Sequence, residues 1–419
     1  MSDSKVLTAP PAAVSRAARR LPRSAGFAAV TAILVLFQAV SSAPAPLYVV
    51  YQRLWGFSSA TLTLIFAIFV FGLLSSLLVL GGLSDHLGRR PVLAAAIVLE
   101  AAALVVFLLA GNVTALLIAR LVQGVATGMV LPALGAVIVD FNPPHAPGRA
   151  AVVSGVVPIG GLALGALVCS SLVQYAPDPT HLVWALLLGA MTLALLAVLA
   201  LPEPSARQPG AVRSLVPRLG VPHRFRGDVY ALMPVIVASW ALGGLYLSLG
   251  PSVAVTVFGV TSHFLGGMVV ALLCGTGAVT AFALRGWPAT VVLRVSMAML
   301  AAGTALTLTG MLSGSVAAAL AGTVVSGIGY GASGLAAFGS MARIAGPADP
   351  AERGGLFAVA YTVAFLAFSL PAVAAGYATT QVGLPATVAV YSVLVIVVAL
   401  VAFAVQEVRS ARRRCAAPR

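Results

Sequence analysis

The sequence predicts an all-α membrane protein with twelve transmembrane helices, which form two six-helix bundles. Of its 419 residues 60% are hydrophobic and 8% are charged, whereas a soluble domain is about 45–50% apolar. Apolar runs of about 20 residues, the length that crosses a bilayer as a helix, recur along the chain. Most of the basic residues fall between these runs rather than within them. Together these features indicate a polytopic membrane protein.

The apolar runs fall into two groups of six, which indicates a chain built from two related halves. The predicted spans are 27–50, 60–82, 91–110, 113–139, 150–173, 181–201, 229–257, 262–284, 289–311, 314–341, 354–379 and 383–405. The predicted organisation is an N-terminal tail 1–26, a first bundle 27–202, a linker 203–227, a second bundle 228–406 and a basic tail 407–419. A weak internal repeat supports this division, because Gly124 and Gly128 of span four have counterparts in Gly327 and Gly331 of span ten.

The distribution of Lys and Arg predicts the orientation, since cytoplasmic loops hold most of these residues. With the N-terminus in the cytoplasm, all 24 Lys and Arg lie in tails or loops on that side except Arg53 and Arg120. We therefore expect an integral plasma-membrane protein with both termini cytoplasmic. The net charge of +14 is explained by this topology, so no nucleic-acid partner is expected.

A short charged segment joins spans two and three: Gly81-Gly82-Leu83-Ser84-Asp85-His86-Leu87-Gly88-Arg89-Arg90. It resembles the signature between helices two and three of the major facilitator superfamily, although His86 replaces the more usual Arg or Lys. The resemblance implies two six-helix bundles that move solutes by alternating access. The equivalent loop of the second half, 284–288, has no acidic residue.

The charges of this segment suit a gate at the cytoplasmic surface. Asp85 is expected to face a helix N-terminus of the other half, where the helix dipole favours an anion. Arg89 and Arg90 are expected to pair with an acid at a neighbouring helix end, for which Asp140 is the best candidate. The alternative is a topological anchor with an ordinary turn. The predicted gate residues are Gly81, Asp85, Gly88, Arg89, Arg90 and Asp140.

Two ionisable residues lie within predicted spans, where ionised groups are costly and often functional. Arg120 begins the segment Arg120-Leu121-Val122-Gln123-Gly124, which resembles a family motif whose arginine is associated with proton transfer. Glu100 lies nine residues after Pro91, which puts it about 14 Å deep at about 1.5 Å per residue. Glu100 is expected either to carry protons or to be held structurally in its neutral form.

The fifth span contains a glycine-rich segment around a proline, which allows bending and close helix packing. Gly155, Pro158, Gly160 and Gly161 partly resemble the interface motif of the family's antiporters, with Val157 in place of a glycine. The prolines of 44–46 likewise resemble the paired prolines of drug exporters, with altered spacing. These resemblances favour export.

The candidate substrate cavity combines aromatic faces with few hydrogen-bonding groups, which suits amphipathic solutes better than sugars. The alternative for each residue is helix packing or an interfacial aromatic belt. The candidates are Gln38, Ser41, Trp240, Tyr246, Tyr361 and Phe365.

The chain lacks a phosphate-binding loop ending in Gly-Lys-Ser or Gly-Lys-Thr, which argues against an ATP-driven pump. Cys169, Cys274 and Cys415 have no metal-binding spacing. The prediction is a monomeric proton-coupled antiporter that exports hydrophobic or cationic small molecules, with the proton gradient in place of a cofactor. The alternatives are uptake or facilitated transport of a metabolite such as a sugar or organic acid, and a non-transporting membrane enzyme or receptor. No enzymatic constellation is expected.

Overall fold

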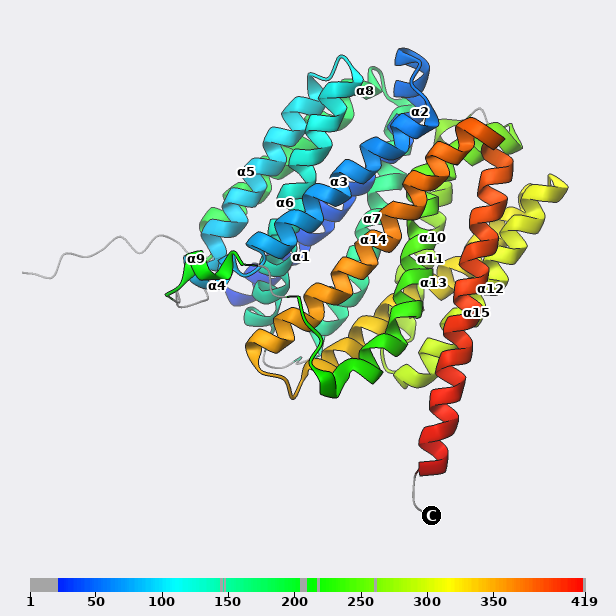
Figure 1. Ribbon diagram of the computed structural model, residues 1–419. Helices are drawn as coiled ribbons and strands as arrows, with labels where there is room; N and C mark the ends of the chain where they lie inside the picture. The colour runs from blue at the N-terminus through cyan, green and yellow to red at the C-terminus, as the bar shows by residue number, and fades with distance from the viewer. Residues whose placement is uncertain are drawn as a thin grey trace, which may run out of the picture.

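The computed structural model describes residues 22–143, 146, 148–203, 209–216, 219–259 and 262–416, and within them it is entirely helical (Figure 1). The predicted tail 1–26 lies outside the described residues up to residue 21. The helices are α1 (Arg23–Ser42), α2 (Pro44–Trp55), α3 (Ser59–Leu80), α4 (Leu83–Leu87), α5 (Arg89–Leu108), α6 (Val113–Asp140), α7 (Arg149–Tyr175), α8 (Pro179–Ala200), α9 (Ala211–Ser214), η1 (His223–Phe225), α10 (Arg226–Phe258), α11 (His263–Ala283), α12 (Ala289–Ser313), α13 (Val316–Ala345), α14 (Pro350–Val382) and α15 (Leu384–Ala416).

Among the described residues, twelve segments are long and apolar enough to cross a membrane, which confirms the predicted number. The first segment is broken between α1 and α2 at Ala43, because Pro44 occupies the first position of α2 and cannot continue the hydrogen-bond ladder. The last helix continues through residues predicted to be a tail and ends only at Ala416. Alanine and arginine are both good helix formers, so the helix extends beyond its apolar segment.

Helices of the first bundle, α1–α8, pack closely through small residues. Gly124 and Gly128 of α6 lie so close to the backbone of Phe69 and Leu73 in α3 that a Cβ on either glycine would overlap it. Gly327 and Gly331 of α13 meet α11 in the same way, around Leu273 and Gly277. In the first half α6 (span four) therefore packs on α3 (span two). In the second half α13 (span ten) packs on α11 (span eight) in the same way. The pairs of glycines therefore occupy equivalent seams in the two halves.

The two bundles meet along α3 with α14 and along α7 with α11. Phe66 of α3 packs on Phe368 of α14 with ring centroids 4.9 Å apart. Towards the end of the molecule that carries α2, Gly376 lies directly against Thr63. In the other seam, at the ends of α7 and α11, the Ser262 hydroxyl donates to Gln174 Oε1 across 3.2 Å. These contacts join the bundles at what we call the α2 end.

The opposite end, which we call the α4 end, carries the signature segment and both termini of the described chain (Figure 1).

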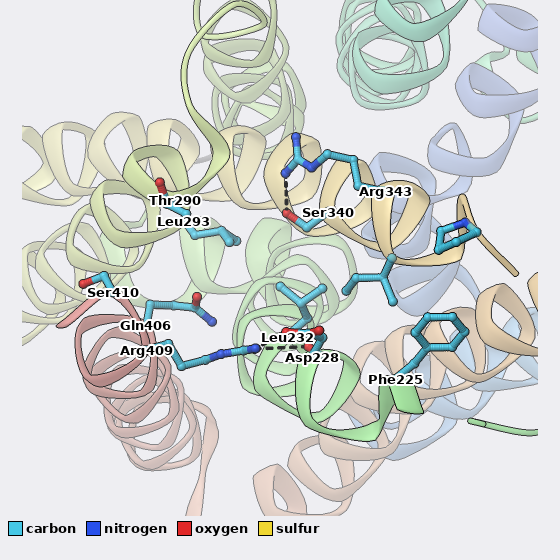
Figure 2. A pocket seen from close by; sticks show the side chains of 12 residues that line it. Phe225, Asp228, Leu232, Thr290, Leu293, Ser340, Arg343, Gln406, Arg409 and Ser410 are labelled. Atoms are coloured by element: carbon cyan, nitrogen blue, oxygen red, sulfur yellow. Dashed lines mark hydrogen bonds and ion pairs between the residues drawn. The ribbon is translucent and has the colours of Figure 1, made fainter. Parts of the chain in front are cut away.

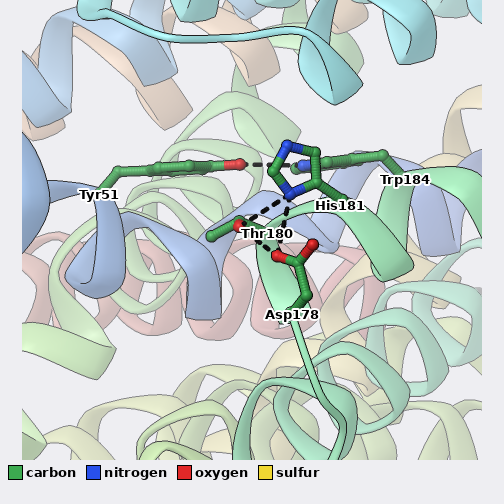
Figure 3. Close-up of polar contacts among 5 residues, drawn as sticks. All are labelled: Tyr51, Asp178, Thr180, His181 and Trp184. Atoms are coloured by element: carbon green, nitrogen blue, oxygen red, sulfur yellow. Dashed lines mark hydrogen bonds and ion pairs between the residues drawn. The ribbon is translucent and has the colours of Figure 1, made fainter.

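Figure 3 shows polar contacts at the α2 end: Trp184 Nε1 donates to the Tyr51 hydroxyl across 2.9 Å. At the start of α8, His181 Nδ1 lies 2.9 Å from Asp178 Oδ1. The hydrogen bond with His181 lowers the pKa of the exposed Asp178 carboxyl below its usual range.

Candidate functional site

A buried polar network crosses the core of the first bundle and is organised by Arg120, whose residue is 2% exposed. Arg120 Nε donates to the Tyr48 hydroxyl across 2.5 Å. Its Nη1 donates to Gln123 Oε1 across 2.6 Å and to the Ser41 carbonyl across 3.3 Å. The guanidinium also lies 5.0 Å from the ring centroid of Phe69. These contacts compensate part of the cost of burying a charge.

Glu100 joins the same network through Gln123, not through a direct ion pair with Arg120. Gln123 Nε2 donates to Glu100 Oε1 across 3.0 Å and to the Val40 carbonyl across 3.3 Å. The other carboxyl oxygen, Oε2, is buried and has no hydrogen-bond partner among the described residues. The predicted proximity of Glu100 and Arg120 is therefore present, with an amide between them.

This arrangement has two chemical consequences. Burial of a carboxylate in the interior costs free energy, which the single hydrogen bond from Gln123 offsets only in part. The Gln123 amide contacts both ionisable groups, and the network also reaches two carbonyls of α1, so hydrogen bonds connect Glu100, Arg120 and the α1 backbone.

An aromatic cluster lies on the second bundle, where its helices face the first. Trp240 of α10 packs edge-on against Phe365 and Phe368 of α14, with centroids 4.8 Å and 5.8 Å away. Tyr361 of α14 continues the cluster, 5.1 Å from Phe338 of α13. Three predicted cavity residues, Trp240, Tyr361 and Phe365, are therefore brought together. Phe338 and Phe368 belong with them, and sequence reasoning missed both.

Tyr246 does not join this cluster, although the sequence analysis named it with Trp240 as a residue of the substrate cavity. Its hydroxyl lies 3.1 Å from Thr323 Oγ1 and 3.4 Å from Thr307 Oγ1, inside the second bundle. There it lines a separate, apolar cavity of about 190 Å³ with residues such as Leu242 and Met268. Tyr246 lies six residues after Trp240, and about 100° of turn per residue puts the two side chains on different faces of α10.

Gln38 and Ser41, the two polar residues predicted to line the cavity, both lie on α1 and both contribute to helix packing. Gln38 Nε2 donates weakly, across 3.4 Å, to the carbonyl of Pro158 in α7. The Ser41 hydroxyl donates to its own helix at Phe37, and its carbonyl accepts from Arg120. Both side chains remain partly accessible.

The glycines of α7 divide between two neighbours. Gly155 and Gly160 face the second bundle, where a Cβ on them would lie 3.3 Å from Leu335 and 3.6 Å from Ala278. Gly161 faces α1, where a Cβ would meet Val35 and Gln38. With Pro158 within the helix, α7 contacts both its own bundle and the other one. The predicted interface position of this segment agrees with its placement.

At the α4 end an open groove of about 730 Å³ lies between the bundles. Arg149, Val152 and Val153 of α7 line one side, and Phe282, Arg285 and Leu335 line the other. The α2 end, in contrast, is joined by the contacts of Thr63 with Gly376 and of Gln174 with Ser262. The interface between bundles is thus closed at the α2 end and hollow at the α4 end.

The signature segment forms ion pairs within the first bundle. Arg89 Nη1 lies 3.0 Å from Asp140 Oδ2, as predicted, and Arg89 Nη2 lies 3.7 Å from Asp85 Oδ1. The expected contact of Asp85 with a helix end of the second bundle is not formed; its side chain is 55% exposed.

The Arg90 guanidinium donates a hydrogen bond to the Leu199 carbonyl and does not pair with an acid, because its position in α5 faces the end of α8. Gly81 follows α3, where a Cβ would lie 3.6 Å from the Pro132 ring of α6.

Glu203 is a functional candidate that sequence reasoning missed. Its Oε1 and Oε2 accept from the backbone N–H groups of Arg89 and Arg90 across 2.9 Å and 3.1 Å, which caps α5. Gly88 permits this geometry, because its φ is +100° and a Cβ would lie 2.9 Å from Glu203 Oε2. The signal in the sequence was an acid directly after span six, at the same end as the signature segment.

Metal-ligating side chains do not cluster in the part of the chain that the structure describes. There, no group of three or more His, Cys, Asp or Glu side chains is arranged to hold a metal ion. Cys169 and Cys274 are buried and unpaired with each other.

Comparison with known proteins agrees with this geometry. Residues 28–347 match the family model described as Major Facilitator Superfamily. No match was found among curated proteins. Among solved structures, the chain resembles the human organic anion transporter MFSD10 (TETRAN), with 19% identity, a TM-score of 0.68 and coverage of 92% of this chain and 100% of that one.

A second similar structure is a bacterial homolog of the human lysosomal transporter Spinster, solved in an inward-facing and unoccupied conformation. It has 15% identity and a TM-score of 0.69, and the match covers 94% of this chain and 98% of that one. At these identities both likenesses establish the fold alone. Given the family match over most of the chain, the protein belongs to the major facilitator superfamily of membrane transporters.

Proposed function

We propose that this transporter is a monomeric proton-coupled antiporter, which exports hydrophobic or cationic small molecules across the plasma membrane. The observation that carries the proposal is the buried Glu100–Gln123–Arg120 network. A carboxyl that alternates between neutral and ionised forms provides the site for the coupling proton. Arg120 stabilises the ionised form across the intervening amide.

The aromatic cluster supports the substrate class. Trp240, Phe338, Tyr361 and Phe365 present large apolar faces with few hydrogen-bonding groups. Such faces bind apolar ring systems, and they attract cations through the negative electrostatic potential of the ring face. A sugar, in contrast, requires many polar partners. The cluster therefore favours amphipathic or cationic solutes.

Alternating access is supported by the asymmetry between the two ends. The bundles touch at the α2 end and leave an open groove of about 730 Å³ between them at the α4 end. We assign the α4 end to the cytoplasm from the distribution of Lys and Arg, so this is an inward-facing conformation. The similarity to a transporter solved in that state is consistent with the assignment.

A second candidate function is transport of an organic acid. Arg149 and Arg285 both line the groove at the α4 end, and neither has an acidic partner among the described residues. Basic side chains on opposite walls attract anions towards the interface between the bundles. A structural neighbour described as an organic anion transporter gives this alternative a precedent on the same fold.

The test is flux in proteoliposomes under an imposed pH difference. A fluorescent lipophilic cation and a fluorescent organic anion are loaded in parallel, with and without the pH difference, and drug susceptibility of cells that express the protein is compared with that of cells that lack it. We expect the cation to move against the proton gradient and susceptibility to fall. Movement of the anion alone would favour the second candidate, and movement of neither would contradict both.

A further inference from the structure

Two cavities lie within the second bundle. The one at the α4 end measures about 390 Å³, and Figure 2 shows that its two arginines already have partners in the same bundle. Arg409 pairs with Asp228, and Arg343 donates to the Ser340 hydroxyl across 2.9 Å. The other cavity lies at the α2 end, measures about 190 Å³ and is lined almost entirely by apolar side chains. We call it the Tyr246 cavity, and its lining points to a ligand.

The Tyr246 cavity corresponds, in the internal repeat, to the place of the buried Arg120. Thr323 lies four residues before the first seam glycine of α13, as Arg120 does before that of α6. The Tyr48 hydroxyl accepts from Arg120 in the first bundle, and the Tyr246 hydroxyl lies 3.1 Å from Thr323 Oγ1 in the second. Each tyrosine belongs to the first membrane-spanning segment of its half. Threonine is much shorter than arginine, so space that a side chain fills in the first bundle is left open in the second.

Hydroxyl groups form the polar part of this cavity. Thr307 and Thr323 each donate to a carbonyl of their own helix, across 3.0 Å and 2.9 Å. The proton of Tyr246 is left for a threonine oxygen, 3.1 Å or 3.4 Å away. Each hydroxyl oxygen has two lone pairs, so acceptor capacity remains after these three protons are used. This patch therefore favours a ligand that donates a hydrogen bond.

A further hydroxyl comes from the helix on another side of the cavity. Ser392 of α15 also lines it, and a serine hydroxyl can donate to a ligand oxygen as well as accept. A ligand hydroxyl has the same two capacities. An O–H group therefore suits this lining better than a group that only accepts.

The size and the apolar wall of the cavity define the body of the ligand. Leu242, Met268 and Val269 are among its apolar lining residues. An apolar cavity of about 150 Å³ holds a molecule of the size of benzene, so about 190 Å³ accommodates one ring with a small substituent. Leu265 and Val316, which also line the cavity, are 43% and 45% exposed. The cavity thus reaches the surface at the starts of α11 and α13.

We infer that the Tyr246 cavity binds a neutral single-ring alcohol of the phenol class, with its hydroxyl on Tyr246, Thr307 and Thr323. A cation is disfavoured, because no Asp or Glu is among the described residues that line the cavity and a buried charge requires a partner. A lipid acyl chain would use the apolar wall but none of the hydroxyls. The site is separate from the aromatic cluster of the proposed transport path, which faces the first bundle.

The experiment is a fluorine NMR titration of the purified full-length protein in lipid nanodiscs with para-fluorophenol. The matched probe is para-fluorotoluene, which has nearly the same shape but no hydroxyl. Tyr246→Phe removes the phenolic oxygen, and Gly250→Leu fills the cavity, since Gly250 lines it and a Cβ there would have its nearest neighbours at 4.0 Å. The controls are Tyr391→Phe, at a buried hydroxyl that donates to the Ala241 carbonyl outside this cavity, and Gly189→Leu, at a glycine of α8 with open space around it.

We expect saturable binding of para-fluorophenol to the unmodified protein. Tyr246→Phe should weaken it about twofold to tenfold, the effect of one hydrogen bond, and should leave binding of para-fluorotoluene unchanged. Gly250→Leu should weaken binding of both probes, and the two controls should weaken neither. Binding that survives both Tyr246→Phe and Gly250→Leu would overturn the site. Tighter binding of para-fluorotoluene than of para-fluorophenol, or an equal loss of the two in Tyr246→Phe, would overturn the alcohol as its ligand.

Discussion

The Gln123 amide nitrogen donates to Glu100 Oε1 across 3.0 Å, and this hydrogen bond links a buried carboxyl to the rest of the polar core. On its other side the same amide accepts from Arg120 across 2.6 Å. The acid form of Glu100 keeps a carbonyl oxygen that can accept from this amide, because its proton can reside on Oε2, which has no hydrogen-bond partner among the described residues. Glu100, Gln123 and Arg120 therefore form one hydrogen-bonded chain, in which Glu100 Oε2 is the atom open to a proton.

Replacing Glu100 with Gln should abolish coupling to protons. The substitution keeps the shape of the side chain and its hydrogen bond but removes the titration that the proposed antiport requires. We expect uphill transport to stop and downhill exchange of substrate to lose its dependence on pH, measured by flux in proteoliposomes. Glu407→Gln, at an acid paired with Arg294 near the surface, is the control. Intact proton-driven transport in Glu100→Gln would assign Glu100 a structural role.

Replacing Gln123 with Leu should destabilise the first bundle. The change leaves Arg120 Nη1 and Glu100 Oε1 without their shared amide, at a cost of about 1–3 kcal/mol for each buried group left unpaired. Thermal unfolding in detergent should shift to lower temperature. Gln52→Leu, which removes a weak hydrogen bond of 3.4 Å to the Phe57 carbonyl, should have little effect. Equal shifts in the two variants would argue against a strongly coupled network.

Replacing Gly88 with Ala should weaken the junction between the signature segment and Glu203. The backbone there has φ of +100°, and a Cβ would lie 2.9 Å from Glu203 Oε2. We expect a loss of about 1–3 kcal/mol in stability from the strained backbone alone. Gly135→Ala is the control, because that glycine lies in α6 with open space around its Cβ direction. An unfolding temperature unchanged in Gly88→Ala would contradict the cap geometry.

Replacing Trp240 with Ala should weaken binding of aromatic or cationic substrates. The indole packs against Phe365 and Phe368 at the interface of the bundles. Loss of one such ring contact is worth about 1–2 kcal/mol, or about fivefold to thirtyfold in apparent affinity. Transport kinetics should therefore show a raised KM. Trp287→Ala, at a tryptophan that is 58% exposed outside the cluster, should leave KM unchanged, and an equal rise there would contradict a substrate role for Trp240.

Replacing Asp85 with Asn should impair transport while membrane insertion stays intact. In this conformation Asp85 contacts Arg89 loosely and is 55% exposed. We therefore expect its principal partner to be a helix end of the second bundle in the conformation closed at the α4 end. Arg285→Gln, on the degenerate loop of the other half, should change the transport rate little. Similar rates for the two variants would contradict a one-sided gate.

The helices and their number follow directly from the sequence, because apolar length and the placement of arginines are local properties. The pairing of Arg89 with Asp140 could also be predicted from the sequence, since both residues lie at the same ends of adjacent spans. Helical phase was the weak point: Tyr246 and Trp240 share one helix but face different surroundings.

Other features depend on how distant segments meet, which a single sequence does not display. Gln123 bridges Glu100 and Arg120 only because α5 and α6 pack in a particular register. Glu203 caps α5 from the far end of α8, 114 positions from Arg89. In the second bundle, Phe338 and Phe368 join Trp240 from two other helices.

The contacts that join the two bundles at the α2 end differ in kind from the ion pairs that the signature segment forms within the first bundle at the α4 end. Between described residues, no ion pair joins the two bundles, and the α2 end is held by small side chains and rings such as Thr63, Gly376 and Phe66. Added salt screens exposed charges but leaves such contacts largely unchanged. Opening of the α2 end should therefore be insensitive to ionic strength, whereas rearrangement of the charged signature segment should not. Salt thus provides a way to distinguish the two halves of the transport cycle kinetically.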